Sequence, residues 1–193
     1  MLNTQCVAGA KRRYIASRRS TPAGEVRWCS LFPMVETWSW SLIWRLSDTL
    51  QVPHKIKAFQ FKLLHQILAA PSKMHVWGMR DSAVCYACGA DKDSIEHMLV
   101  LCPWSMAIWT QVLERFQRDE SVAFTWSPEH LLFGFVQPIL HSETQRRLNT
   151  IILLAKHYIY SQRRAESFSF SAVAFRFVLQ RYIYCSNSTR RKQ

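Results

Sequence analysis

The clearest pattern in the chain is a run of apolar residues between Pro53 and Pro71 that recurs with the period of an α-helix. Its members lie three or four residues apart and are Ile56, Phe59, Leu63, Leu64, Ile67 and Leu68. This spacing places them on one helical face, while Lys55 and Lys62 fall mostly on the other. Pro53 suits the first turn of a helix, and Pro71 ends it after Ala70. The pattern therefore predicts an amphipathic helix with a basic outer face.

Shorter helices are predicted on either side of this one. The tryptophan-rich segment 36–50 places large apolar side chains on one helical face, namely Trp40, Ile43 and Trp44, with Trp38 beside them. After the long helix, Ser72 has the side chain of an N-cap, and Gly78 can close the short helix that Ser72 begins.

The second half of the chain continues the helical pattern. Pro103 can open a helix whose buried stripe would be Ile108, Trp109, Val112, Leu113 and Phe116. Ser127-Pro128-Glu129 is a helix-start signature. A long helix is predicted over about 142–164, with Lys156 among the basic residues outside its apolar stripe, and a last helix over 169–184. The predicted fold class is therefore mostly α.

Composition supports a folded helical domain with basic ends. Of the 193 residues, 49% are hydrophobic and only five are glycine, which argues against disorder and against a loop-rich all-β fold. The net charge of +12 divides into +5 for residues 1–30, −1 for 31–140 and +8 for 141–193. We expect a basic, flexible N-terminal arm (1–33), a helical zinc-binding domain (34–118, with its core at 54–116) and a basic helical C-terminal region (119–193).

The stretch CYACGADKDSIEHMLVLC, from Cys85 to Cys102, has the spacing C-x2-C-x8-H-x4-C. Thiolates and imidazole are ligands that zinc prefers, and four of them complete a tetrahedral shell. We predict that one zinc ion is held by Cys85, Cys88, His97 and Cys102. A closed shell leaves no position for a substrate, so this zinc would be structural. Two other interpretations stay open: buried thiols without a metal, and a redox pair formed by Cys85 and Cys88.

The residues around these ligands suggest how the site is built. Gly89 allows a tight turn after the first pair of cysteines. Asp93 can cap a helix, with Glu96 as its reciprocal partner. His97 and Cys102 are five residues apart, which is more than one helical turn, so a slight unwinding before Cys102 would help both to face one ion.

The segment from His54 to Trp109 resembles the zinc-binding region that follows the polymerase in non-LTR (LINE-type) retrotransposon reverse transcriptases. Shared features are the basic amphipathic helix, the C-x2-C pair, Glu-His followed by apolar residues, Cys-Pro, and a tryptophan at position 109. Residues 36–50 extend the resemblance toward the N-terminus, and residues 148–164 resemble the C-terminal tail of the vertebrate elements.

This resemblance implies an accessory nucleic-acid-binding part that holds template RNA or target DNA. It also assigns the metal positions to Cys85, Cys88, His97 and Cys102. The polymerase of that family needs adjacent aspartates, which this chain lacks, and an endonuclease domain is also missing. We therefore expect no enzymatic activity and no catalytic residues.

Basic residues on the predicted helices are candidates for phosphate contacts, and they are Lys55, Lys57, Lys62, Arg146, Arg147, Arg163 and Arg164. Trp77 and Tyr86 are aromatic candidates for stacking on bases, although Trp77 suits the core better. The alternatives are a structural module that docks on a polymerase domain, and a retrotransposon remnant without a function. Salt dependence of binding separates phosphate contacts from apolar docking.

The expected compartment is a reducing one, the nucleus or the cytoplasm, because six cysteines occur without a secretion signal. No apolar run is long enough to cross a membrane. Residues 1–24 are basic and contain no acidic residue, a composition that would also suit mitochondrial targeting.

Overall fold

The computed structural model describes residues 21–164 and Phe175, and within them every regular element is helical. This confirms the mostly α fold class. The elements are α2 (Ala23–Leu31), the 3-10 helix η1 (Pro33–Thr37), α3 (Trp40–Thr49), α4 (His54–Leu64), α5 (Pro71–Val76), the π-helical turn η2 (His97–Leu101), α6 (Pro103–Glu120), α7 (Pro128–Phe133) and α8 (Ser142–Arg164). Among these described helices none is both long and apolar enough to cross a membrane. Apart from Phe175, the predicted helix 169–184 lies outside the described residues.

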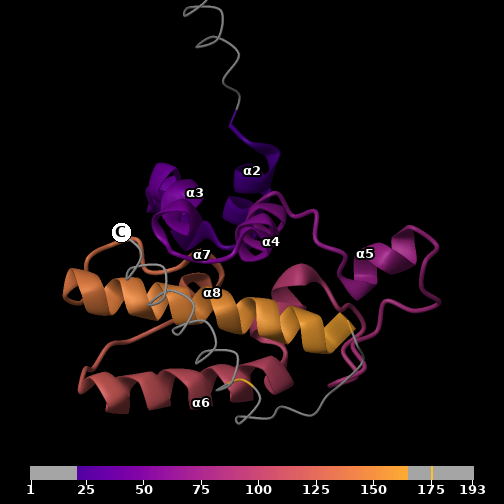
Figure 1. Cartoon of the computed structure of the whole chain (residues 1–193). Helices are drawn as coiled ribbons and strands as arrows, with labels where there is room; N and C mark the ends of the chain where they lie inside the picture. Colours follow the sequence, from indigo (N-terminus) through magenta and orange to yellow (C-terminus); the bar gives the residue numbers. More distant parts are fainter. Residues whose placement is uncertain (1–20, 165–174, 176–193) are drawn as a thin grey trace, which may run out of the picture.

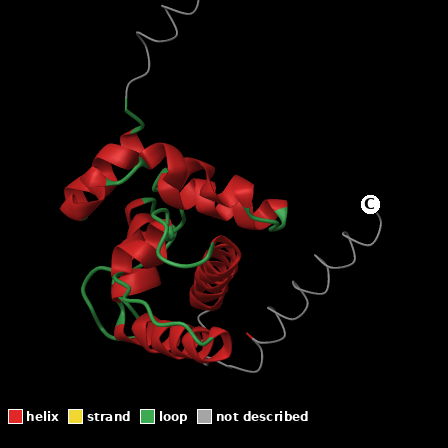
Figure 2. Cartoon of the chain, turned by 90° about the vertical axis from the view of Figure 1, so that its left-hand side faces the viewer, coloured by secondary structure: helices red, strands yellow, loops and turns green. Residues whose placement is uncertain are grey.

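The long helix α8 lies at the centre of the molecule. Figure 1 shows it between α6 on one side and the group formed by α2, α3 and α4 on the other, and Figure 2 shows the same order of layers from the side. α8 contacts α4, α6, α7 and η2. Its buried apolar stripe includes Leu148, Ile152, Ala155 and Ile159. One continuous core therefore joins the N-terminal and C-terminal halves of the described chain.

Several aromatic residues from different elements meet around Phe133 of α7. Its ring lies 5.4 Å from that of Trp28 and 5.6 Å from that of Trp40, measured between centroids, and both pairs meet edge to face. Phe32 and Trp38 contact the same ring at 6.4 Å. Edge-to-face contacts are the favourable geometry for aromatic pairs. The tryptophans of the N-terminal segment therefore serve mainly to join α2 and α3 to α7.

Helix α2 docks against the C-terminal end of α4. The Trp28 indole N–H donates to the carbonyls of Leu63 and Leu64, at 3.3 and 3.1 Å. Gly24 lies so close that a Cβ atom at this position would be 2.1 Å from the Leu64 oxygen. The segment 1–33, expected as an arm, thus contains a packed helix, while the other domain boundaries stay predictions.

Helix α4 ends at Leu64, which is six residues earlier than predicted. The Ile67 amide donates to the Lys62 carbonyl and the Gln66 amide to that of Leu63, both at 2.8 Å, a pairing that forms a Schellman motif. Gln66 takes the left-handed conformation there (φ 55°), a position where glycine is usual. The sequence has no glycine at this position to mark the end of the helix. The prediction that Ile67 belongs to the buried face is therefore wrong, and Ile67 is 53% exposed.

The N-cap of helix α5 lies two residues earlier than predicted. Ala70 occupies the N-cap position and Pro71 opens the helix. Ser72 lies inside the helix instead of capping it, and its amide donates to the Asp93 carbonyl at 3.1 Å. By contrast, the bounds of α8, the start of α6 at Pro103 and the buried stripe of α6 are as predicted.

Candidate metal centre

The first two cysteines lie on a tight turn between α5 and η2. The Gly89 amide donates to the Cys85 carbonyl at 2.7 Å, and the Cys85 amide donates to the Ala90 carbonyl at 2.8 Å. Gly89 has φ +75° and open space where a Cβ would lie, so the turn needs glycine for its backbone conformation rather than for close packing. This geometry agrees with the role predicted for Gly89.

The other two ligands lie at the ends of the π-helical turn η2. The Cys102 amide donates to the His97 carbonyl at 2.8 Å, a bond that spans five residues instead of the four of an α-helix. This wider turn is the local unwinding predicted before Cys102. The helix start differs from the prediction, because Ser94 and not Asp93 accepts the His97 amide, at 3.3 Å. Asp93 has another partner, described below.

The wider turn leaves backbone carbonyls without their usual helical donors, and side chains from α6 supply replacements. The Ser105 hydroxyl donates to the Met98 carbonyl at 2.7 Å, and the Trp109 indole donates to the Leu99 carbonyl at 2.8 Å. Both donors are fully buried, where an unpaired carbonyl would be costly. Trp109, part of the sequence resemblance, therefore supports the turn that carries two ligands.

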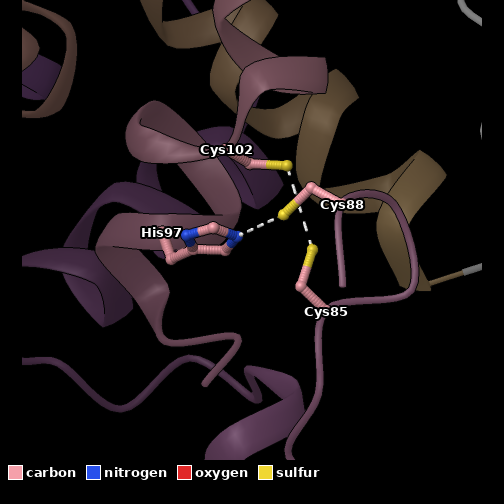
Figure 3. A group of neighbouring side chains, drawn as sticks. All are labelled: Cys85, Cys88, His97 and Cys102. Carbon is pink, nitrogen blue, oxygen red and sulfur yellow. Dashed lines mark hydrogen bonds between the residues drawn. The ribbon is translucent and has the colours of Figure 1, made fainter. Parts of the chain in front are cut away.

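The four predicted ligands point toward one another (Figure 3). Their ligand atoms all lie within 4.8 Å of one another. The Sγ atoms of Cys85 and Cys102 are 3.8 Å apart, and Cys88 Sγ lies 3.3 Å from His97 Nε2. Tetrahedral zinc, with bonds of about 2.3 Å to sulfur and about 2.0 Å to nitrogen, requires separations of about 3.8 and 3.5 Å. The donor set and its dimensions therefore suit one Zn²⁺.

The ligands differ in burial and in their electrostatic surroundings. Cys85 and Cys102 are fully buried, whereas Cys88 is exposed. Burial raises the pKa of the Cys102 thiol to about 11. Burial also acts to raise the pKa of Cys85, but hydrogen bonds from Arg163 and His97 outweigh it and lower that pKa to about 6. The lowered pKa favours the thiolate of Cys85, the form that coordinates zinc, and zinc itself deprotonates the thiols that coordinate it.

Arg163, expected to contact nucleic acid, lies instead beside the metal ligands. Its side chain is 2% exposed and pairs with Asp93 at 2.5 Å, whose side chain is 3% exposed. Its guanidinium also donates to Cys85 Sγ at 2.9 Å and lies 3.7 Å from Cys102 Sγ. Arg163 is thus inaccessible to phosphate, which corrects its assignment. No local sequence pattern indicates this ion pair, because Asp93 and Arg163 are 70 residues apart.

The other basic candidates fall into two groups. Three lie beside carboxylates: Lys57 with Asp48 (4.0 Å), Arg146 with Glu143 (2.6 Å) and Arg147 with Glu120 (2.5 Å). Lys55, Lys62 and Arg164 are exposed, and they form no ion pair with the part of the chain that the structure describes. That any of these residues binds nucleic acid stays a prediction.

Two further placements differ from the sequence interpretation. Trp77, predicted to suit the core better than the surface, is 51% exposed. Lys156, expected on the outer side of its helix, is 2% exposed, and its Nζ atom donates to Gln60 Oε1 at 2.8 Å and to the Leu132 carbonyl at 2.6 Å. A lysine next to an apolar stripe gives no sign in sequence that it is buried.

Comparison with known proteins agrees with the geometry. Residues 27–109 match the sequence model of a family described as zinc-binding in reverse transcriptase. The matched segment contains all four ligands and ends at Trp109, so α7 and α8 lie outside it. No curated protein and no solved structure matches the chain significantly. The segment that holds the metal centre is thus similar to the zinc-binding segment associated with reverse transcriptases, and its cofactor is one zinc ion.

Proposed function

We propose that this chain is a zinc-dependent nucleic-acid-binding accessory domain of a non-LTR retrotransposon reverse transcriptase, without polymerase or endonuclease activity of its own. The observation that carries the proposal is a group of exposed basic residues along the junction of α4 and α8. We call this group, Lys55, Lys62 and Arg164, the basic seam.

The basic seam follows from the way α4 and α8 pack. Lys55 and Lys62 lie four residues before and three residues after Phe59, so each is a neighbour of Phe59 at the exposed edge of the buried face of α4. The Phe59 ring contacts His157 and Tyr160 of α8, at 5.4 and 5.3 Å between centroids.

The α8 side of the junction also carries positive charge. The Arg164 guanidinium lies 5.9 Å from the Tyr160 ring centroid. Burial, and then the charge of Lys55, lowers the pKa of His157, which places Lys55 near α8. The seam therefore brings cations from two helices to one junction.

Electrostatic attraction to phosphate needs cations that are exposed and not already neutralised. The three residues of the seam meet this condition within the described chain, whereas Arg146 and Arg147 are paired with carboxylates. The seam is also linked to the metal centre, because Arg164 directly follows Arg163 on α8. Zinc would thus contribute to binding by fixing the end of α8.

Exposed aromatic residues support a single-stranded partner. Trp77 and Tyr86 are 51% and 56% exposed. The Arg80 guanidinium lies 4.3 Å from the centroid of the Tyr86 ring. Aromatic rings and guanidinium planes are the groups on which unpaired bases stack.

The test is the salt dependence of binding to a short, unstructured single-stranded RNA, followed by fluorescence anisotropy with the full zinc-loaded chain. Two lost phosphate contacts reduce the slope of log K against log salt by about 1.4 for a single strand. We expect this reduction for Lys55→Gln/Lys62→Gln. The matched control is Arg115→Gln/Arg118→Gln, which removes the same charge from exposed positions on α6.

Equal slopes of log K against log salt for both double variants would contradict phosphate binding by the basic seam. Loss of positive charge would then have the same effect wherever it lies on the surface. Binding that does not depend on salt would favour the alternative, an apolar surface that docks on a polymerase domain. That alternative draws on exposed apolar residues at the end of α5, namely Val76, Trp77 and Met79.

A further inference from the structure

The last turn of α8 contributes a cation to the metal centre from outside the segment that matches the zinc-binding family. Arg163 reaches the buried side of the cluster, where its guanidinium meets the sulfurs of Cys85 and Cys102 and the carboxylate of Asp93. The guanidinium carbon also lies 5.8 Å from the centroid of the Trp104 ring. Arg163 is therefore held between the metal ligands, an acidic partner and an aromatic ring.

Charge balance explains why a cation is needed here. Three thiolates and one neutral imidazole around Zn²⁺ carry a net charge of −1. Two of these thiolates, Cys85 and Cys102, are fully buried, and Asp93 adds a second buried negative charge. Burying a charge without a compensating partner is strongly unfavourable. The guanidinium of Arg163 is the cation that both the sulfurs and the carboxylate contact.

The backbone around Asp93 holds this partner in place. The Asp93 amide donates to the Ala83 carbonyl at 2.7 Å, and its own carbonyl accepts the Ser72 amide at 3.1 Å. Asp93 thus lies between the turn that carries Cys85 and the start of α5. A carboxylate fixed in this way orients the planar guanidinium, whose other N–H groups then face the sulfurs.

We infer that Arg163 is a positioning residue of the zinc centre: it donates N–H···S hydrogen bonds to the ligand sulfurs, compensates their charge, and so couples zinc affinity to the docking of α8. Hydrogen bonds to metal ligands orient them and adjust their electron density, and their loss typically lowers metal affinity by 10- to 100-fold. Coupling is reciprocal, so zinc in turn stabilises the C-terminal end of α8.

The test compares zinc affinity, measured by competition with a chelator, among variants of the full chain. Arg163→Met keeps much of the side-chain length and removes the hydrogen bonds and the charge, and we expect zinc affinity to fall about 10- to 100-fold. Arg163→Lys keeps the charge without the planar fork and should show a smaller loss. Arg118→Met, which removes an exposed arginine of α6 outside the cluster, is the matched control and should bind zinc as the wild type does.

A spectroscopic measurement distinguishes this role from a purely structural ion pair. Co²⁺ in place of zinc gives a sulfur-to-metal charge-transfer band that depends on hydrogen bonding to the thiolates. We expect the band to shift in Arg163→Lys and to stay unchanged in Arg118→Met. If Arg163→Met does not fold, the Arg163→Lys spectrum and affinity decide the question.

Asp93→Asn supplies the second comparison, because it breaks the ion pair and leaves the N–H···S bonds in place. We expect it to weaken zinc binding less than Arg163→Met does. Equal losses in these two variants, wild-type zinc affinity in Arg163→Met, or an unshifted band in Arg163→Lys would overturn the inference. None of these outcomes depends on nucleic-acid binding.

Discussion

The amine of Lys156 lies among apolar residues where α4, α7 and α8 meet. Its partners, Gln60 Oε1 and the Leu132 carbonyl, are both uncharged. Burial lowers the pKa of this lysine from its ordinary 10.5 to about 7. A neutral amine satisfies both acceptors with its two hydrogens, whereas the charged form must be desolvated without a counter-charge among its described partners.

This environment predicts a dependence of stability on pH. Between pH 7 and pH 10.5 the unfolded chain binds the proton and the folded chain does not, so stability rises with pH by up to about 1.4 kcal/mol per pH unit. Below pH 7 both states bind it and the slope disappears. Lys156→Met should remove this slope. Urea denaturation of zinc-loaded protein at pH 7, 8 and 9 measures it, and an identical slope in wild type and variant would contradict the burial of the amine.

At the scale of single elements, the π-helical turn η2 connects metal binding to the core. His97 and Cys102 lie at its two ends, while Met98, Leu99 and Val100 between them are buried. Ser105 and Trp109 of α6 hold its carbonyls from the other side. Two kinds of interaction therefore stabilise the turn: metal coordination by His97 and Cys102, and the packing and hydrogen bonds of the residues between them.

We predict that removal of zinc by a chelator opens the cysteine turn and the end of η2 while the centre of α8 stays closed. A loss of about 1.4 kcal/mol in local opening free energy speeds amide exchange about tenfold. Hydrogen exchange should show this for the amides of Cys85, Gly89 and Cys102, which close these turns. Amides around Ile152 serve as the internal control. If amide exchange accelerates equally in these turns and around Ile152, the metal stabilises the fold as a whole and not these turns in particular.

At the scale of the whole molecule, the metal site joins the turn that carries Cys85 and Cys88 to the π-helical turn η2. The chain also buries an aromatic cluster around Phe133, and none of the rings that meet Phe133 in this cluster belongs to a metal ligand. Zinc should therefore be needed for the metal segment and for part, not all, of the total stability.

Ligand replacement tests this at the level of the full chain. Cys88→Ser removes an exposed ligand, and we expect zinc content to fall from about one ion per chain to nearly none. A loss of only 2 kcal/mol would lower the Tm by about 4–8 °C. Cys29→Ser is the matched control, because Cys29 is a free thiol outside the cluster. Metal analysis and thermal unfolding measure both effects, and full zinc content in Cys88→Ser would reject the site.

The features that could be predicted from the sequence are those that depend on the spacing of residues within one segment. Residue types and intervals identified the four ligands and the unwinding before Cys102, and apolar periodicity gave the bounds of α8. Interactions between distant segments were missed. Arg163 and Lys156 both had the sequence pattern of solvent-exposed basic residues, yet each is buried by partners at least 24 residues away. The early end of α4 was missed because Gln66, not glycine, takes the left-handed position.

The position of Arg163 on α8 has a practical consequence for how this protein can be divided. A chain shortened to end at residue 118 would retain every ligand atom and the entire family-matching segment. It would nevertheless lose the guanidinium that contacts Cys85 and expose the apolar faces of α4 and α6 that α8 covers. We therefore expect the smallest fragment that reproduces the zinc chemistry of the full chain to extend through Arg163.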